Sequence, residues 1–209
     1  SYYKLPAPQT ALENCVAHNG SLVPVPGRDI MVQAWYQGGM SIFDFTDPAH
    51  PYEIAYFDRG PISGEEMLLS GFWSTYWYNG HIYASEIGRG LDVFELLPSE
   101  HLSRNEIEAA KSVVVDQLNV QHQDRITWPA TMTVARAYLD QLRRDSSMPD
   151  HVATLAAEID AIASAPAAER DQALLHASGS AMGLRAHASG IEARRLELLS
   201  QVLTEMAND

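Results

Sequence analysis

Hydrophobic and polar residues follow two different periods along this chain. Up to Pro98, apolar residues come in short runs that are bounded by Gly, Pro, Asn and Asp, a pattern typical of β-strands joined by turns. Beyond Pro98 they recur every three or four residues over longer stretches, as on one side of a helix. The pattern therefore predicts a mixed fold, with strands first and helices after them.

The strand region divides into short apolar segments separated by strong turn signals. Gly38-Gly39, Asp47-Pro48 and Asn79-Gly80 supply the backbone freedom or the fixed φ that tight turns need. In the segment 40–45 the alternation is too loose for a one-sided sheet, so we expect both of its faces to be covered. The predicted strands are residues 21–25, 30–36, 40–45, 52–57, 72–78, 81–87 and 91–97, with a strand end also at Tyr2 to Leu5.

The strand region also repeats itself. Asp29 to Phe45 aligns without a gap with Gly80 to Leu96, fifty-one residues later, and in the same register Gly20 falls on Gly71 and Leu22 on Trp73. A fixed period near fifty that is built from short strands suits a β-propeller blade of four strands. We therefore expect about two four-stranded antiparallel units.

Helix signals begin after the repeat. Ser103 and Glu106 have the spacing of a capping box, in which each side chain bonds the other residue's main-chain N–H. Later helices are expected to start at Thr131 or Thr133, at Ser147 and at Pro166, and a last helix is expected over 191–206. The helix that starts at Pro166 is expected to loosen at Gly179 and Gly183. The predicted domains are propeller-like blades (1–98), a capping helix and connector (99–129) and an α-helical bundle (130–209).

Composition narrows the class of partner. The formal net charge of -13 disfavours nonspecific binding to nucleic acid or to anionic membranes. No apolar run approaches the ~18 residues of a membrane span, and the first residues are no signal peptide. Cys15 is the single cysteine, so it is either a small buried hydrophobe or half of a bridge to residues outside this chain; no local pattern favours a catalytic thiol.

One segment resembles a known repeat. Gly39, the strand Met40 to Asp44, then Asp47-Pro48 and Pro51 are similar to the LVIVD repeat, whose unit is a glycine, a hydrophobic strand ending in Asp, an Asp-Pro turn and a second Pro. Ser41 and Phe43 stand at the two valine positions. Leu91 to Glu95 is a more degenerate copy, with Glu95 in place of the Asp and no Asp-Pro turn after it.

This resemblance implies fold and location more than chemistry. It implies β-propeller blades of an exported, extracellular bacterial protein, and no catalytic residue set or cofactor belongs to the repeat. Two blades cannot close a ring, because a repeat array buries its core only by stacking. We therefore expect the chain to be the C-terminal part of a longer protein, with its missing N-terminal blades as partners.

Aromatic residues supply the candidate binding site. Strict alternation over 72–78 would place Trp73 and Trp77 on one face and Phe72, Tyr76 and Tyr78 on the other. Such rings either fill the space between blades or form a platform on which a carbohydrate stacks. Charged residues of the 86–92 turn either border this platform or are merely solvated. The candidate ligand-binding residues are Trp35, Trp73, Tyr76, Trp77, Glu86 and Arg89.

Histidines give only a weak metal hypothesis. His18 and His81 lie near equivalent turns of the two repeats, and a propeller axis can collect one residue from each blade. No HxH, HExxH or CxxC spacing is present, so we interpret both as exposed or structural and predict no metal site.

The leading hypothesis is therefore a non-catalytic extracellular binding module for a carbohydrate or a protein. The first alternative is a propeller-type hydrolase or oxidoreductase whose axial site is completed by missing blades. The second is that the helical tail is only a structural cap over an exposed blade edge.

Overall fold

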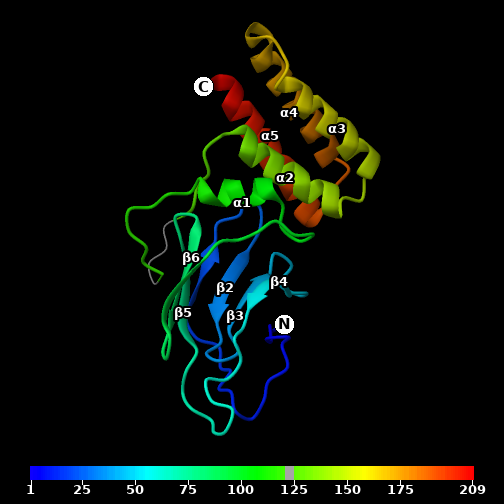
Figure 1. Ribbon diagram of the computed structural model, residues 1–209. Helices are drawn as coiled ribbons and strands as arrows, with labels where there is room; N and C mark the ends of the chain where they lie inside the picture. The colour runs from blue at the N-terminus through cyan, green and yellow to red at the C-terminus, as the bar shows by residue number, and fades with distance from the viewer. Residues whose placement is uncertain (121–124) are drawn as a thin grey trace. The chain divides into compact units, whose positions relative to one another are not determined.

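The computed structural model describes residues 1–120 and 125–209, which form two compact units (Figure 1). The first unit comprises residues 1–102 and 110–127, and the second comprises residues 103–109 and 128–209. Two antiparallel sheets belong to the first unit, and four long helices belong to the second. A short helix, α1 (Arg104–Lys111), has residues in both. The predicted mixed fold is confirmed. The predicted connector includes residues 121–124, which lie outside the described residues.

The first sheet has four strands in the order β1-β2-β3-β4, and the second has three in the order β5-β6-β7. The prediction of two four-stranded units is therefore wrong for the second. In the first sheet, the Asp47-Pro48 turn returns the chain for a fourth strand. After β7 no such turn exists, and the chain runs through Pro98 into α1. The strands are β1 (Gly20–Val23), β2 (Ile30–Ala34), β3 (Met40–Asp44), β4 (Tyr52–Phe57), β5 (Phe72–Tyr78), β6 (His81–Glu86) and β7 (Gly90–Phe94).

The β2–β3 and β6–β7 hairpins have the same register. Met31 pairs with Phe43, and fifty-one residues later Ile82 pairs with Phe94. A glycine with the same conformation starts each return strand: φ is 81° at Gly39, just before β3, and 99° at Gly90, the first residue of β7. This positive φ is costly for residues with a Cβ, which explains glycine at both places. The sequence repeat is thus a structural repeat over these hairpins.

The preceding hairpins differ in length. The last pairs are Val23 with Ile30 in the first sheet and Tyr78 with His81 in the second, where Asn79 and Gly80 alone form the turn. Both turn residues have positive φ, 45° and 97°, as a two-residue hairpin loop requires. The first turn is four residues longer, so the alignment of Gly20 with Gly71 and of Leu22 with Trp73 does not hold in the structure.

Both faces of β3 are covered, as the loose alternation predicted, and all five of its residues are buried. Tyr3 covers one face: its ring stacks on Phe43 at 4.0 Å between centroids, and its hydroxyl lies 2.6 Å from the Ser41 hydroxyl. The opposite face lies toward the second sheet, where the rings of Phe57 and Phe94 are 4.7 Å apart. No strand forms at the N-terminus, so the predicted strand end at Tyr2 to Leu5 is wrong.

A buried ion pair joins the two ends of the β2–β3 hairpin. The Arg28 guanidinium lies 2.6 Å from Asp44, and both side chains are almost fully buried. Arg28 also donates to the main-chain oxygen of His101 at 2.7 Å, while Asp44 accepts from the main-chain N–H of Thr46 at 2.7 Å. Further hydrogen bonds therefore compensate the desolvation of both charges.

The four helices of the second unit pack around one apolar core. Each presents a buried stripe. The spacing of three or four predicts Val134, Tyr138, Leu139 and Leu142 for α2 and Val152, Leu155, Ile159 and Ile162 for α3, and all eight are buried. Burial of these stripes, rather than intrinsic propensity, stabilises helices of this length. The helices are α2 (Met132–Asp145), α3 (Pro149–Ile162), α4 (Ala167–Arg185) and α5 (Gly190–Asn208). No helix within the described residues is long and apolar enough to cross a membrane.

Helix starts follow the predictions in part. The capping box is present: Ser103 accepts from the Glu106 N–H at 3.1 Å, and Glu106 accepts from the Ser103 N–H at 2.7 Å. Thr131 caps α2 as expected. Ser147 does not cap α3, because Met148 occupies that position and the Ser146 hydroxyl accepts from its N–H. The helix α4 also continues through Gly179 and Gly183 without the predicted loosening.

The repeat offers a matched test of the buried ion pair. Asp44 and Glu95 occupy the same repeat position, but Glu95 is 54% exposed and binds Lys111 at 2.8 Å. We expect Asp44→Asn to lower the free energy of unfolding by about 3 kcal/mol, because it leaves the Arg28 charge buried without its counterion. Glu95→Gln should leave the urea midpoint close to that of the wild type. Equal effects of the two variants would contradict this interpretation.

Candidate functional site

A bulge in β5 separates the two tryptophans that alternation would place together. The pairing with β6 slips between Phe72 and Ser74, so one extra residue, Trp73, is inserted into the strand. An extra residue reverses the facing of those beyond it. Trp77 is consequently buried, with 4% of its surface exposed, whereas Trp73 is 45% exposed. The predicted face shared by Trp73 and Trp77 is therefore wrong.

Trp73 belongs instead to a small aromatic cluster with His18 and Tyr36. The His18 ring lies 4.3 Å from the Trp73 ring, and Tyr36 meets Trp73 edge-on at 5.9 Å. The His18 Nδ1 atom is 2.5 Å from the main-chain oxygen of Trp73, so this histidine supports the bulge. His81 is elsewhere, near the ring of Tyr83. Among residues 1–120 and 125–209, no group of three or more His, Cys, Asp or Glu residues could hold a metal ion.

Trp35 is a core residue of the first unit. Only 9% of its surface is exposed, and it meets the Tyr3 ring edge-on at 6.2 Å. It therefore fills space beside the first sheet.

Glu86 and Arg89 lie close together, but Glu86 supports the backbone. Glu86 is 3% exposed, and its Oε1 atom accepts from the Ser70 hydroxyl at 2.9 Å and from the Gly71 N–H at 2.7 Å. Arg89 is 3.6 Å from the same oxygen. A hollow of about 10 Å³ adjoins this carboxylate, which is room for one water molecule. The hollow beside this pair is therefore too small for a ligand larger than water.

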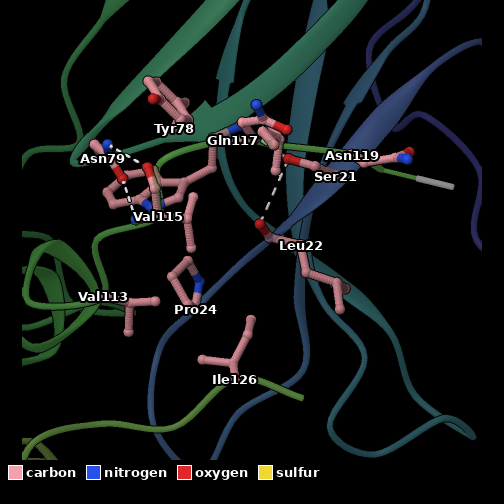
Figure 2. Close-up of a pocket in the computed structure, with 12 residues that line it drawn as sticks. Ser21, Leu22, Pro24, Tyr78, Asn79, Val113, Val115, Gln117, Asn119 and Ile126 are labelled. Atoms are coloured by element: carbon pink, nitrogen blue, oxygen red, sulfur yellow. Dashed lines mark hydrogen bonds between the residues drawn. The ribbon is translucent and has the colours of Figure 1, made fainter. Parts of the chain in front are cut away.

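A larger cavity of about 110 Å³ lies between β1, β5 and the segment 113–119 that follows α1 (Figure 2). Figure 2 shows the side chains of Leu22, Pro24, Val113 and Ile126 on one side of the space. Polar side chains lie on the other side. The remaining lining residues are Ser21, Trp77, Tyr78, Asn79, Val115, Gln117, Leu118 and Asn119. The cavity thus combines an apolar wall with a polar border, as binding pockets do.

Trp77 links this cavity to the core of the first unit. Its main-chain N–H donates to the Ser21 hydroxyl at 2.8 Å. Its indole Nε1 is buried and has no hydrogen-bond partner among the described residues. A buried donor without a partner costs about 1–3 kcal/mol. A ligand acceptor that reached this N–H would recover part of that cost.

The segment 113–119, which we call the strap, is held in place by the β5–β6 turn. The Asn79 amide donates to the Val115 oxygen at 3.0 Å and accepts from the Val115 N–H at 2.9 Å (Figure 2). The Tyr78 hydroxyl donates to the main-chain oxygen of Asp116 at 3.1 Å. One turn side chain therefore satisfies both main-chain groups of a strap residue, as a strand partner would.

Tyr76 lies beside this site on the outward face of the second sheet. It is half-buried, pairs across the strands with Tyr83 and lines a shallow hollow with Tyr78 and the strap. Tyr78 is common to this hollow and to the cavity. Of the six residues predicted to bind a ligand, only Trp77 lines the cavity between β1, β5 and the strap, and Tyr76 lines the hollow next to it.

Sequence reasoning missed most of the cavity because its lining comes from three distant segments. The strap falls in a stretch that carries no strand or helix pattern. The Asn79-Gly80 signal marks a turn but does not show which main-chain groups the Asn79 side chain will bind.

Comparison with protein-family models, with curated proteins and with solved structures finds no match. The resemblance to the LVIVD repeat therefore stays a prediction.

Removing the Asn79 side chain should release the strap. We expect Asn79→Gly to speed hydrogen exchange of the Val115 amide at least about tenfold, because both bonds to Val115 are lost. Glycine also tolerates the positive φ, so the hairpin itself should persist. Asp116→Ala is the matched control, since only the main-chain oxygen of Asp116 takes part. Unchanged protection of Val115 in Asn79→Gly would show that other contacts hold the strap.

Cys15 is poorly suited to nucleophilic chemistry. Burial, and then the nearby charges of Glu13 and Asp58, raise the pKa of its thiol to about 11. The thiolate is the reactive form, so this thiol is almost entirely protonated and unreactive at neutral pH.

Alkylation by iodoacetamide tests this state of Cys15. At pH 8 the folded chain should react at least about tenfold more slowly than the urea-unfolded chain, whose thiol has an ordinary pKa near 8.5. The folded rate should rise about tenfold per pH unit up to about pH 10, because the thiolate fraction does so below the pKa. A rate that levels off below pH 9 would contradict the raised pKa.

Proposed function

We propose that this chain is a non-catalytic interaction module whose first unit anchors one apolar side chain of a partner protein. The observation that carries the proposal is the cavity of about 110 Å³ beside Trp77. Pockets for whole small molecules usually measure about 300–1,000 Å³, whereas a cavity near 150 Å³ holds a benzene ring. The size of this cavity suits a single ring or a branched aliphatic side chain.

The surroundings of the cavity favour a polypeptide over a carbohydrate. The polar groups of Ser21, Asn79 and Gln117 can meet the main chain of a segment whose side chain enters the apolar part. Carbohydrate stacking needs an open aromatic face, but Trp77 is buried and Trp73 is in contact with His18. Deep apolar anchors of this kind supply most of the affinity in protein interfaces.

We also propose that the two sheets are propeller-like blades of a larger exported protein and that the second unit is a helical bundle. The equal register of the β2–β3 and β6–β7 hairpins and the LVIVD-like residues support the first part. The single core shared by α2 to α5 supports the second. Neighbouring blades would then belong to the same polypeptide as this chain.

Blocked single amino acids can test the anchor cavity directly. We expect N-acetyl-leucinamide and N-acetyl-phenylalaninamide at millimolar concentration to shift the indole N–H signal of Trp77 in ¹⁵N NMR spectra. N-acetyl-glycinamide should not shift it, because it has no side chain to bury.

Two neighbouring residues supply matched variants for this experiment. Val113→Trp should abolish the shift by filling the cavity that Val113 lines. Val114→Trp should leave it unchanged, because Val114 is 70% exposed and lines no part of the cavity. Trp73→Ala should also bind normally. No response to either apolar probe, or loss of response in Trp73→Ala, would overturn the proposal.

A further inference from the structure

The second sheet ends at β7, at the place where the first sheet has a fourth strand. The register of β6–β7 equals that of β2–β3, so β7 corresponds to β3. Beside β3 lies β4, in a pairing that joins Met40 to Phe57 and Asp44 to Tyr52. Within the described residues, β7 pairs with β6 alone. Its outer edge therefore presents main-chain N–H and C=O groups that another strand can pair.

The opposite edge of the second sheet is already occupied. Phe72 in β5 exchanges two main-chain hydrogen bonds with Tyr36, at 2.9 and 3.2 Å. Further along β5, the Thr75 N–H donates to the Asn19 oxygen at 3.3 Å. The edge at β7 is therefore the one at which this sheet can grow.

An apolar groove of about 230 Å³ begins where β7 ends. Ile54 and Phe57 of β4 line it from the first sheet, and Phe94, the last residue of β7, and Leu97 beyond it line it from the second. In the first sheet, β4 covers the position next to β3. Within residues 1–120 and 125–209 the second sheet has no strand at that position, and the groove lies between β4 and the chain that leaves β7.

The edge at β7 also lacks the features that normally block strand addition. Exposed edges are usually protected by Pro, Lys or other charged residues. The β4 edge follows Pro51, whereas no proline precedes β7. The edge at β7 exposes Leu91 (66%) and Val93 (53%), and its charged residue, Asp92, is bound by Arg59 through two hydrogen bonds of 2.8 Å.

We propose that β7 accepts an extended segment of a partner polypeptide as the fourth strand of the second sheet. Main-chain hydrogen bonds to β7 would give affinity, and apolar side chains at alternate positions would enter the groove. The net charge of -13 favours a segment with basic flanks. This site is separate from the cavity at Trp77 and does not rest on the function proposed for it.

The fourth strand of the first sheet supplies the probe. A peptide with the β4 sequence Tyr-Glu-Ile-Ala-Tyr-Phe and one Lys at each end is added to the full chain. We expect hydrogen exchange of the amides of 91–94 to slow at least tenfold at saturation. A peptide with Pro at its Ala position and at its Phe position should have no effect, because the residues of β4 at these positions pair with Ile42 and Met40 through their main chains and Pro has no N–H to donate.

Two exposed leucines make the test specific to the groove. Leu97→Asp should weaken peptide binding at least tenfold, because Leu97 lines the groove, whereas Leu69→Asp should not change it. Leu97 is 74% exposed and Leu69 is 65% exposed, so both variants should fold. Val113→Trp, which fills the other cavity, should bind the peptide normally. Binding without protection of β7, or protection of β7 through self-association of the chain without peptide, would overturn the proposal.

Discussion

The buried contact between Arg28 and Asp44 fixes the geometry on which the first unit depends. The two residues lie just before β2 and at the end of β3, so their pairing closes the hairpin at the end opposite its turn. Arg28 also holds the main-chain oxygen of His101, more than seventy residues later, and approaches the Tyr52 hydroxyl of β4. Because a buried charge without its partner is costly, this hairpin, β4 and the end of the strand region are constrained together.

The second sheet repeats the hairpin but not this contact. Asn79 stands where the repeat has Arg28, and Glu95 stands where it has Asp44. Glu95 is exposed and paired with Lys111, and Asn79 binds the strap instead. The buried carboxylate of the second sheet is Glu86, which holds the Gly71 turn. The same backbone register is therefore kept by different interactions, and this leaves Asn79 free to shape the cavity.

Local signals predicted the parts of the fold that local physics determines. Glycine pairs, Asp-Pro and Asn-Gly placed the hairpins, and helical spacing placed the buried stripes of α2 and α3. The bulge at Trp73 was not predictable, because alternation carries no sign that one residue is inserted. The position of the strap depends on bonds between Asn79 and Val115, thirty-six residues apart, which no local pattern encodes. The missing fourth strand was hidden because the repeat itself suggested a complete unit.

Both surfaces suited to binding arise where the second sheet departs from the first. In a repeat array, each unit buries its surface against its neighbours. The short Asn79-Gly80 turn lets the strap close over β1 and β5, which creates the cavity at Trp77. In the part of the chain that the structure describes, the second sheet has no fourth strand, which leaves the edge of β7 unpaired and the groove where β7 ends. Both proposed binding sites therefore lie at irregularities of the repeat, while the buried contact of Arg28 and Asp44 constrains the half of the unit in which the sheet is complete.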